Sequence, residues 1–416
     1  MAGISAKRAK TAQTALLAIF FTQGFAAMST LPRIPEILQQ IHVVFAEWGL
    51  IIGLSGIGSL LPLAFTNKLV SRFGTSIVIR LSALGITLTL FSIPWITNSA
   101  LMFFVYLAQA LMFSTFNIAL NAQAVAFQKK LGRVLLGTLH GAWSVGAALT
   151  TTFTGWLISF ALDFKIQMVI VPVFCLVVFQ IAGSKLLTFE EERSGADSKP
   201  GKKVSWLKSP TYLWLLAIGL FAGMWPELVV MDWSSLFVRK IYGNEYTSLA
   251  GVPYAVLGAA MVIGRFSIAS LTKRYHLATL AKWGGIFGSI AMGIGVLGSL
   301  IPGGFVIQCI FFGLAGFGLA PQVPSSYSAA GNVRGLSTAQ ALSRISLVNA
   351  LVVMIAKVFM GGLAQGFGLQ WAFVFPITMF FIAGLVSSVV ANHSKRQASE
   401  DATAYPPTGP ISSIDA

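Results

Sequence analysis

Long apolar stretches alternate with short polar ones along the chain as far as residue 391. A helix needs about 20 predominantly apolar residues to cross the hydrocarbon core of a bilayer. Twelve stretches approach or exceed that length, so the pattern predicts an all-α membrane protein with twelve transmembrane helices. The expected spans are 12–31, 48–66, 75–96, 100–127, 135–160, 166–188, 211–237, 247–271, 278–300, 304–329, 338–364 and 370–391.

The long charged interval between spans, residues 189–210, also contains Pro, Gly and Ser. It separates six spans from six more, which predicts two pseudo-symmetric six-helix bundles, 1–188 and 211–391, joined by a linker. The polar, proline-containing segment 392–416 has too few apolar residues to build a core, and we expect a disordered tail there.

Composition supports the membrane interpretation and excludes a soluble one. Hydrophobic residues make up 56% of the chain and charged residues only 10%, with a mean hydropathy of +0.78. Globular domains carry about 25% charged residues. The net charge of +15 does not indicate nucleic acid binding, because the basic residues are spread over many loops and do not gather on one face. Cys175 and Cys309 both lie inside apolar runs, which is typical of small buried side chains.

The basic residues show which way the chain crosses the membrane. With the N-terminus inside, 21 Lys and Arg residues fall in inside segments and 4 in outside segments, and 3 more lie within apolar runs. Positive charge is retained on the cytoplasmic side, so we expect both termini and the linker to be cytoplasmic.

A short internal repeat relates the two halves. The loop after the second span and the loop after the eighth share three residue types at an offset of 202 positions: Leu69, Arg72 and Phe73 recur as Leu271, Arg274 and Tyr275. Parallel repeats of this kind place a binding site near the membrane midplane, between the halves.

The span pattern, the cytoplasmic linker and the basic loops resemble the major facilitator superfamily over roughly residues 12–391. Three stretches resemble its bacterial permease branch near the fucose:proton symporters: FNIALNAQAVAFQKKLGRVLLGTLHGAWSVG (116–146), PELVVMDWSSLFV (226–238) and GFGLAPQVPSSYSAAGN (316–332). The resemblance implies the superfamily fold, a bacterial inner-membrane location, a monomer and proton symport. It also implies gating roles for the loop arginines Arg72 and Arg274, and a gate or scaffold charge at Arg265, in the Gly-Arg pair of the eighth span.

The chain departs from the superfamily pattern at several positions. Ser71 replaces the acidic residue expected before Arg72, and neutral Asn117 stands where the branch has an acid. Coupling through the fourth span is therefore not implied. The fifth span has no proline between residues 141 and 155, which disfavours drug efflux.

Acidic residues inside apolar runs are costly and indicate function. Glu227 lies 16 residues beyond Thr211, about 24 Å along a helix, and follows Pro226, which removes a backbone hydrogen bond. We expect Glu227 to carry the coupled proton; the alternative is a permanently paired structural carboxylate. Asp232 is a second coupling candidate. It lies about 140° around the helix from Glu227, so it need not share its face and can equally anchor the helix end beside Trp233.

Neutral polar residues supply candidates for the substrate cavity. His140, Trp143 and Ser144 share one helix face and offer an imidazole, an indole and a hydroxyl. Amides donate and accept hydrogen bonds without a charge cost, which suits a neutral or polyhydroxylated solute. The candidate amides are Gln23, Asn117, Asn121 and Gln322, the last in a span interrupted by prolines. All of these side chains can alternatively serve helix packing.

Arg344 and Lys357 in the eleventh span are ambiguous. A side chain facing the cavity favours an anionic substrate, whereas one that snorkels to an interface says nothing about substrate.

We therefore expect a secondary active transporter that moves a small polar solute, such as a sugar-like one, by alternating access and with proton coupling. The alternative is efflux of a hydrophobic or anionic compound. An enzyme is not expected, because the four histidines fall on separate segments. The sequence has no phosphate-binding G-x-x-x-x-G-K-[ST] loop, and we expect no metal or cofactor, a small solute and membrane lipid as partners, and a proton gradient as the driving force.

Overall fold

The computed structural model describes residues 5–132, 135–193, 210–331, 333 and 336–404, and its secondary structure is entirely helical. The first half contains α1 (Ala6–Met28), η1 (Leu31–Arg33), α2 (Ile34–Gln40), α3 (Phe45–Leu54), α4 (Ile57–Leu60), α5 (Pro62–Phe73), α6 (Thr75–Ser92), η2 (Ile93–Trp95), α7 (Ser99–Leu131), α8 (Leu136–Ser159) and α9 (Phe164–Gly183), and α10 (Phe189–Arg193) follows it. The second half contains α11 (Thr211–Tyr242), η4 (Asn244–Leu249), α12 (Val252–Leu271), α13 (Leu277–Gly298), α14 (Gly304–Leu319), α15 (Gln322–Gly331), α16 (Thr338–Phe367), α17 (Leu369–Ala372) and α18 (Val374–Ala404).

Most of the expected spans are present as apolar helices. Within the described ranges, 10 stretches are long and apolar enough to cross a membrane, or 11 if the pair Phe45–Leu60 and Pro62–Phe73, bent by 42°, forms one span. The expected span 135–160 is present as α8, a 24-residue helix that is not among these 11. Helix α8 carries no Asp, Glu, Lys or Arg, so its threonines and other polar side chains account for its lower hydropathy. The total of twelve spans in two bundles of six stays a prediction.

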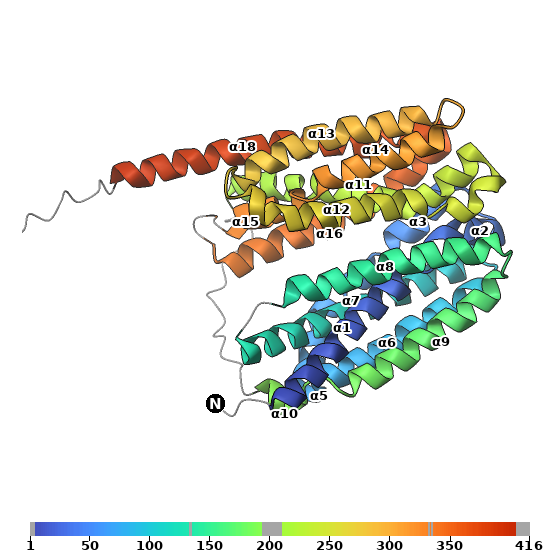
Figure 1. Cartoon of the computed structure of the whole chain (residues 1–416), viewed down its shortest axis with the longest axis horizontal. Coiled ribbons are helices and arrows are strands. Elements are labelled where there is room, and N and C mark those ends of the chain that lie inside the picture. The colour runs from blue at the N-terminus through green and yellow to red at the C-terminus, as the bar shows by residue number, and fades with distance from the viewer. Residues whose placement is uncertain (1–4, 133–134, 194–209, 332, 334–335, 405–416) are drawn as a thin grey trace, which may run out of the picture.

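The helices of each half pack mainly with one another (Figure 1). In the first half α1 packs on α8 and α9, and α6 packs on α7 and α9; in the second half α13 packs on α14 and α18, and α12 on α14. Helix α3 is an exception, because it packs along α16 of the other half. This contact and that between α8 and α12 join the halves.

The two ends of the molecule differ. Figure 1 places the N-terminus, α10 and the last part of α18 at one end, here called the linker end, and α2 at the opposite or far end. The halves approach closely at the far end: Gly49 of α3 lies against Gly361 of α16, and Gly155 of α8 lies against the backbone of Ser248 in η4. A Cβ atom at any of these glycines would overlap atoms of the other half, so glycine allows the close contact.

Exposed apolar side chains form stripes on the outer helices. On α9 they recur every three or four residues, which marks one helix face directed away from the protein core. In a membrane protein such a face contacts lipid. The α9 stripe consists of Ile166, Ile170, Val173, Val177 and Ile181.

The ends of the two halves include helical residues that the sequence pattern does not predict. Residues 194–209, most of the expected linker 189–210, lie outside the described residues, and the linker begins with a helical turn, α10. The expected disordered tail 392–416 is wrong over its first part, because α18 continues to Ala404. Residues 392–404 lack proline and include Ala, Lys, Arg, Gln and Glu, which favour helix, and this local preference extends the last span. Residues 405–416 lie outside the described residues.

Prolines act differently in two spans. Helix α11 continues through Pro226, which removes one backbone hydrogen bond and does not end the helix. The tenth span is broken as expected, because α14 ends at Leu319 and α15 begins at Gln322, on either side of Pro321.

Candidate functional site

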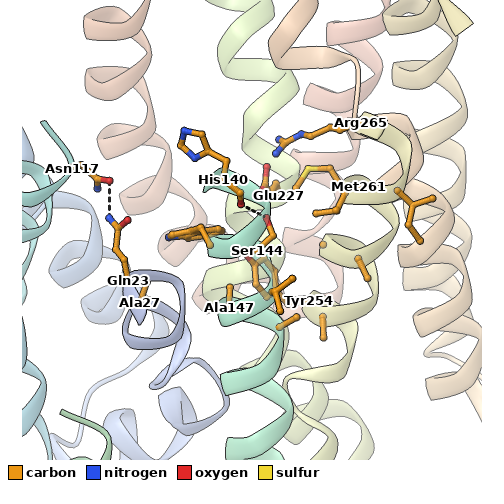
Figure 2. A pocket seen from close by; sticks show the side chains of 18 of the residues that line it. Gln23, Ala27, Asn117, His140, Ser144, Ala147, Glu227, Tyr254, Met261 and Arg265 are labelled. Carbon is orange, nitrogen blue, oxygen red and sulfur yellow. Dashed lines mark hydrogen bonds between the residues drawn. The ribbon is translucent and has the colours of Figure 1, made fainter. Parts of the chain in front are cut away.

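A cavity of about 610 Å³ lies between the two halves, and we call it the central cavity. Its walls come from α1, α7 and α8 of the first half and from α11 and α12 of the second. Figure 2 shows its polar side chains converging from both sides. It therefore lies where a parallel two-half repeat places a solute site.

Two amides form one wall of the central cavity. Gln23 Nε2 on α1 donates a hydrogen bond to Asn117 Oδ1 on α7 over 2.7 Å. Gln23 is only 3% exposed, whereas Asn117 is exposed toward the cavity that it lines. The pair satisfies one donor and one acceptor, and each amide keeps a further hydrogen-bonding group for a ligand.

Helix α8 forms the adjoining wall with His140, Trp143 and Ser144, as the helical spacing predicts. The ring of His140 lies edge-on to Phe20 of α1, with ring centroids 5.3 Å apart. Ser144 Oγ donates to the carbonyl oxygen of His140 over 3.1 Å, so its lone pairs, more than its proton, are available to a solute.

The opposite wall carries charge. Glu227 of α11 is partly buried, and the guanidinium of Arg265 of α12 extends toward its carboxylate in Figure 2. Arg265 interacts electrostatically with both Glu227 and His140. Tyr254 of α12, 7% exposed, also lines this wall. The cavity therefore holds a carboxylate and a guanidinium of opposite charge, with an imidazole across from them.

A second chamber of about 490 Å³ adjoins the central cavity, and both are lined by Ala27 and Phe113. It lies among α1, α3, α7, α11 and α16. Lys357 Nζ of α16 lies 2.8 Å from Asp232 Oδ2 in its wall. Asp232 is thus separated from Glu227 although the two acids are five residues apart on α11. The angle between the two acids around an unbroken helix explains why they line different cavities. Lys357 forms an ion pair with Asp232.

The second chamber also contains buried polar atoms without a protein partner. Among the described residues, Trp48 Nε1 and Asn349 Oδ1 are buried and accept or donate no hydrogen bond. A buried polar group without a partner is costly. The chamber is consequently suited to a polar occupant.

The structure brings together most of the predicted cavity residues and excludes two. Gln322 is 2% exposed, does not line the central cavity, and donates to the carbonyl oxygens of Ala281 and Gly318. Asn121 is also absent from the cavity lining, and its Nδ2 donates to the carbonyl oxygen of Asn117. The expectation of cavity roles is wrong for these two amides, because nearby backbone carbonyls bind them.

The three arginines expected to act in gating occupy different places. Arg72, at the end of α5, is exposed and lies 5.2 Å from the ring centroid of Phe73. Arg274, just beyond α12, is exposed as well. Arg265 lines the central cavity, whereas the resemblance implied a gate or scaffold charge at this position. Arg344 is 4% exposed and does not line either chamber.

The sequence interpretation missed Tyr254 as a cavity residue. Tyr254, Gly258, Met261 and Arg265 line the cavity together and follow one another at intervals of three or four residues. Tyr254 and Arg265 are polar side chains on the same face of a mostly apolar helix, three turns apart, and this was the available signal.

Within the described residues, no group of three or more His, Cys, Asp and Glu side chains could hold a metal ion. Cys175 and Cys309 are free thiols.

Residues 16–335, well over half of the chain, match the Major Facilitator Superfamily. The chain belongs to the Major Facilitator Superfamily. It is 26% identical over 359 residues to an uncharacterised MFS-type transporter of Yersinia pestis, covering 85% of this chain and 89% of the relative. It is 24% identical over 396 residues to an uncharacterised transporter of Sinorhizobium fredii, covering 92% and 98%.

Solved transporters share the fold. A mutant of the nucleoside transporter NupG aligns with a TM-score of 0.75 at 13% identity, covering 91% of this chain and 99% of that one. A bacterial homologue of the human lysosomal transporter Spinster, in an inward-facing and unoccupied conformation, aligns with a TM-score of 0.71 at 14% identity, covering 94% and 98%. The superfamily and these relatives indicate a multi-pass membrane transporter and not an enzyme.

Proposed function

We propose that this protein is a secondary active transporter that moves a small polar solute by alternating access and couples its movement to protons through Glu227. The observation that carries the proposal is the position of Glu227, in the wall of a cavity between the halves and facing Arg265. A carboxylate there meets solvent, solute and a fixed cation in turn as the cavity opens and closes. It can therefore gain and lose a proton during the cycle.

The two ends of the molecule support alternating access. At the far end Phe45 N donates to Gln365 Oε1 over 3.1 Å, across the two halves. Toward the linker end, His140 and Arg265 are exposed, although both lie in the cavity wall. If the linker end is cytoplasmic, as the excess of basic residues in its loops favours, this arrangement is an inward-facing one. The Spinster homologue that shares the fold was solved in a conformation of that description.

The substrate we favour is neutral and polar, such as a sugar-like solute. The Gln23–Asn117 pair, Trp143 and Ser144 offer hydrogen bonds and an aromatic face without net charge. Glu227 and Arg265 carry opposite charges, so the cavity as a whole does not select an anion. NupG, which shares the fold, transports nucleosides, which also contain a sugar.

Testing this proposal first requires a solute that the protein binds. A thermal-shift screen of the purified protein across sugars, nucleosides, organic acids and peptides identifies a stabilising solute, which then serves as the substrate in proteoliposomes. We expect Glu227→Gln to abolish uptake driven by a pH gradient and to spare counterflow exchange. Glu245→Gln, an acid in η4 outside the cavity, is the matched control and should retain both. Concentrative uptake by Glu227→Gln at the normal rate would exclude proton coupling through this residue.

Efflux of a hydrophobic or anionic compound is the second candidate. Arg265 and the many apolar residues that line the cavity favour it. Stabilisation by anions alone in the same screen, abolished by Arg265→Gln, would select this function over uptake of a neutral solute.

The remaining expectations are part of the proposal. The two halves, 1–188 and 211–391, would tilt as bundles about the central cavity, with the 189–210 linker between them. The protein would work as a monomer in a bacterial inner membrane, with both termini cytoplasmic and a proton gradient in place of a cofactor.

A further inference from the structure

A groove of about 520 Å³ lies between α1 and α9 at the linker end, apart from both cavities. Its lining includes Ile181, which is 55% exposed and ends the lipid-facing stripe of α9. The groove therefore opens toward the surrounding lipid.

Two facing helix stripes form the groove. On α1, Lys7, Lys10 and Thr14 follow one another at intervals of three and four residues and share one face, which continues inward to Ala18. On the α9 side, Lys185 lies just beyond the helix end, above the apolar residues of the last turns. Each wall is thus basic at its outer end and apolar at its inner end, with Thr11 and Thr14 between the two parts on α1.

The groove is strongly positive. None of its ten lining residues is acidic, and three are lysines. The acids that follow Lys185, Glu190, Glu191 and Glu192, do not line the groove. Glu191 is held by Arg8, whose Nη2 lies 2.7 Å from Glu191 Oε2. Arg8 also donates to the carbonyl oxygens of Lys185 and Leu186, and it does not line the groove.

The order of groups along the groove matches the order of groups in an anionic phospholipid. From Lys7 to Ala18 is 11 residues, about 16 Å along a helix, which spans a headgroup and the first part of an acyl chain. Lysines at the membrane surface attract lipid phosphate, and basic pockets between helices bind anionic headgroups. A free phosphate ion would leave the apolar part of the groove uncovered.

We propose that this groove binds an anionic phospholipid, with its phosphate among Lys7, Lys10 and Lys185 and an acyl chain along the apolar walls. The binding is independent of the transport reaction and of the solute.

Equilibrium binding of tail-labelled phosphatidylglycerol and phosphatidylcholine to the full-length protein in neutral detergent micelles tests the proposal. We expect saturable binding of phosphatidylglycerol and little binding of phosphatidylcholine. The variant Lys7→Gln/Lys10→Gln/Lys185→Gln should bind phosphatidylglycerol about tenfold more weakly or worse. The control Lys129→Gln/Lys273→Gln/Lys282→Gln removes the same charge elsewhere and should bind as the native protein does.

Two further measurements separate a lipid from a phosphate site. Ile181→Asn, an exposed position, should weaken phosphatidylglycerol binding severalfold without changing the melting temperature. Glycerol phosphate, a headgroup without chains, should fail to displace the lipid at millimolar concentration. Equal binding of the two lipids, equal losses in the two triple variants, or displacement by glycerol phosphate would each overturn the proposal.

Discussion

Lys357 Nζ on α16 lies 2.8 Å from Asp232 Oδ2 on α11, and the two side chains are only 16% and 15% exposed. The pair connects two helices of the second half and lines the second chamber. Asp232 was a candidate for proton coupling or for anchoring the helix end beside Trp233, and the ion pair with Lys357 favours a structural role.

Removing one member of this pair should destabilise the protein more than removing both. Lys357→Met leaves an unpaired buried carboxylate, at a cost of roughly 3–5 kcal/mol, whereas Asp232→Asn/Lys357→Met leaves no charge. We expect a clear drop in melting temperature for the single variant and recovery in the double variant, measured by tryptophan fluorescence in nanodiscs. Lys240→Met, at an exposed lysine of α11, is the control. A single variant as stable as the native protein would show that the pair contributes nothing.

Locking the far end should stop transport. Phe45→Cys/Gln365→Cys places cysteines at two neighbouring positions on opposite halves, in a background with Cys175 and Cys309 replaced by alanine. We expect oxidation to abolish solute uptake and reduction to restore it, because the halves must separate there. The control Gln40→Cys/Ile96→Cys joins two positions within the first half and should leave uptake intact. Undiminished uptake after complete cross-linking of the first pair would exclude alternating access by tilting of the halves.

The close contact between α1 and α8 should not tolerate a residue larger than glycine at positions 24 and 146. A Cβ atom on Gly24 would overlap the carbonyl of Trp143, and one on Gly146 would overlap the carbonyl of Phe21. Overpacking of this kind costs typically about 1–3 kcal/mol. We expect Gly146→Ala to lower the melting temperature and to weaken solute binding, since α8 carries the cavity residues. Gly141→Ala on the same helix meets nothing within 4 Å and should be neutral or slightly stabilising. Equal melting temperatures for the two variants would contradict the close approach.

The docking of α10, at the start of the linker, against α1 should depend on pH. Hydrogen bonds from the Arg8 guanidinium lower the pKa of Glu191 from its usual 4.5 to about 2. Docking of α10 favours the ionised carboxylate of Glu191. The stability that this contact gives the docked α10 is therefore fully present above pH 4.5 and falls as the pH drops toward 2. Spin labels at Ala6 and Glu190 should report a short, narrow distance at pH 7 that broadens below pH 4.5. Arg8→Gln should broaden this distance distribution at neutral pH as well. A distribution that stays the same at low pH and in Arg8→Gln would contradict the contact between Arg8 and Glu191.

The sequence predicted which side chains share a helix face better than it predicted which groups those side chains bind. His140, Trp143 and Ser144 share a face by spacing alone, and they line the cavity together. Gln322 and Asn121 were equally plausible cavity residues, but backbone carbonyls from α7, α13 and α14 occupy their amides. The Asn117 and Gly318 carbonyls lie four residues before these amides, and only the Ala281 carbonyl comes from a neighbouring span. The spacing of residues does not show whether an amide binds a backbone carbonyl or faces the cavity.

The length of each apolar span and the positions of the basic residues can be read directly from the sequence. They are informative because the bilayer acts on each span separately. They determined the helical membrane class, they predict a division at 189–210, and the local residue types of 226–238 singled out Glu227. Only the tertiary structure decided the partners. Each residue turns the helix by about 100°, so Glu227 and Asp232 enter different cavities. Glu227 faces Arg265 of α12, the next long helix, and Asp232 pairs with Lys357 of the more distant α16.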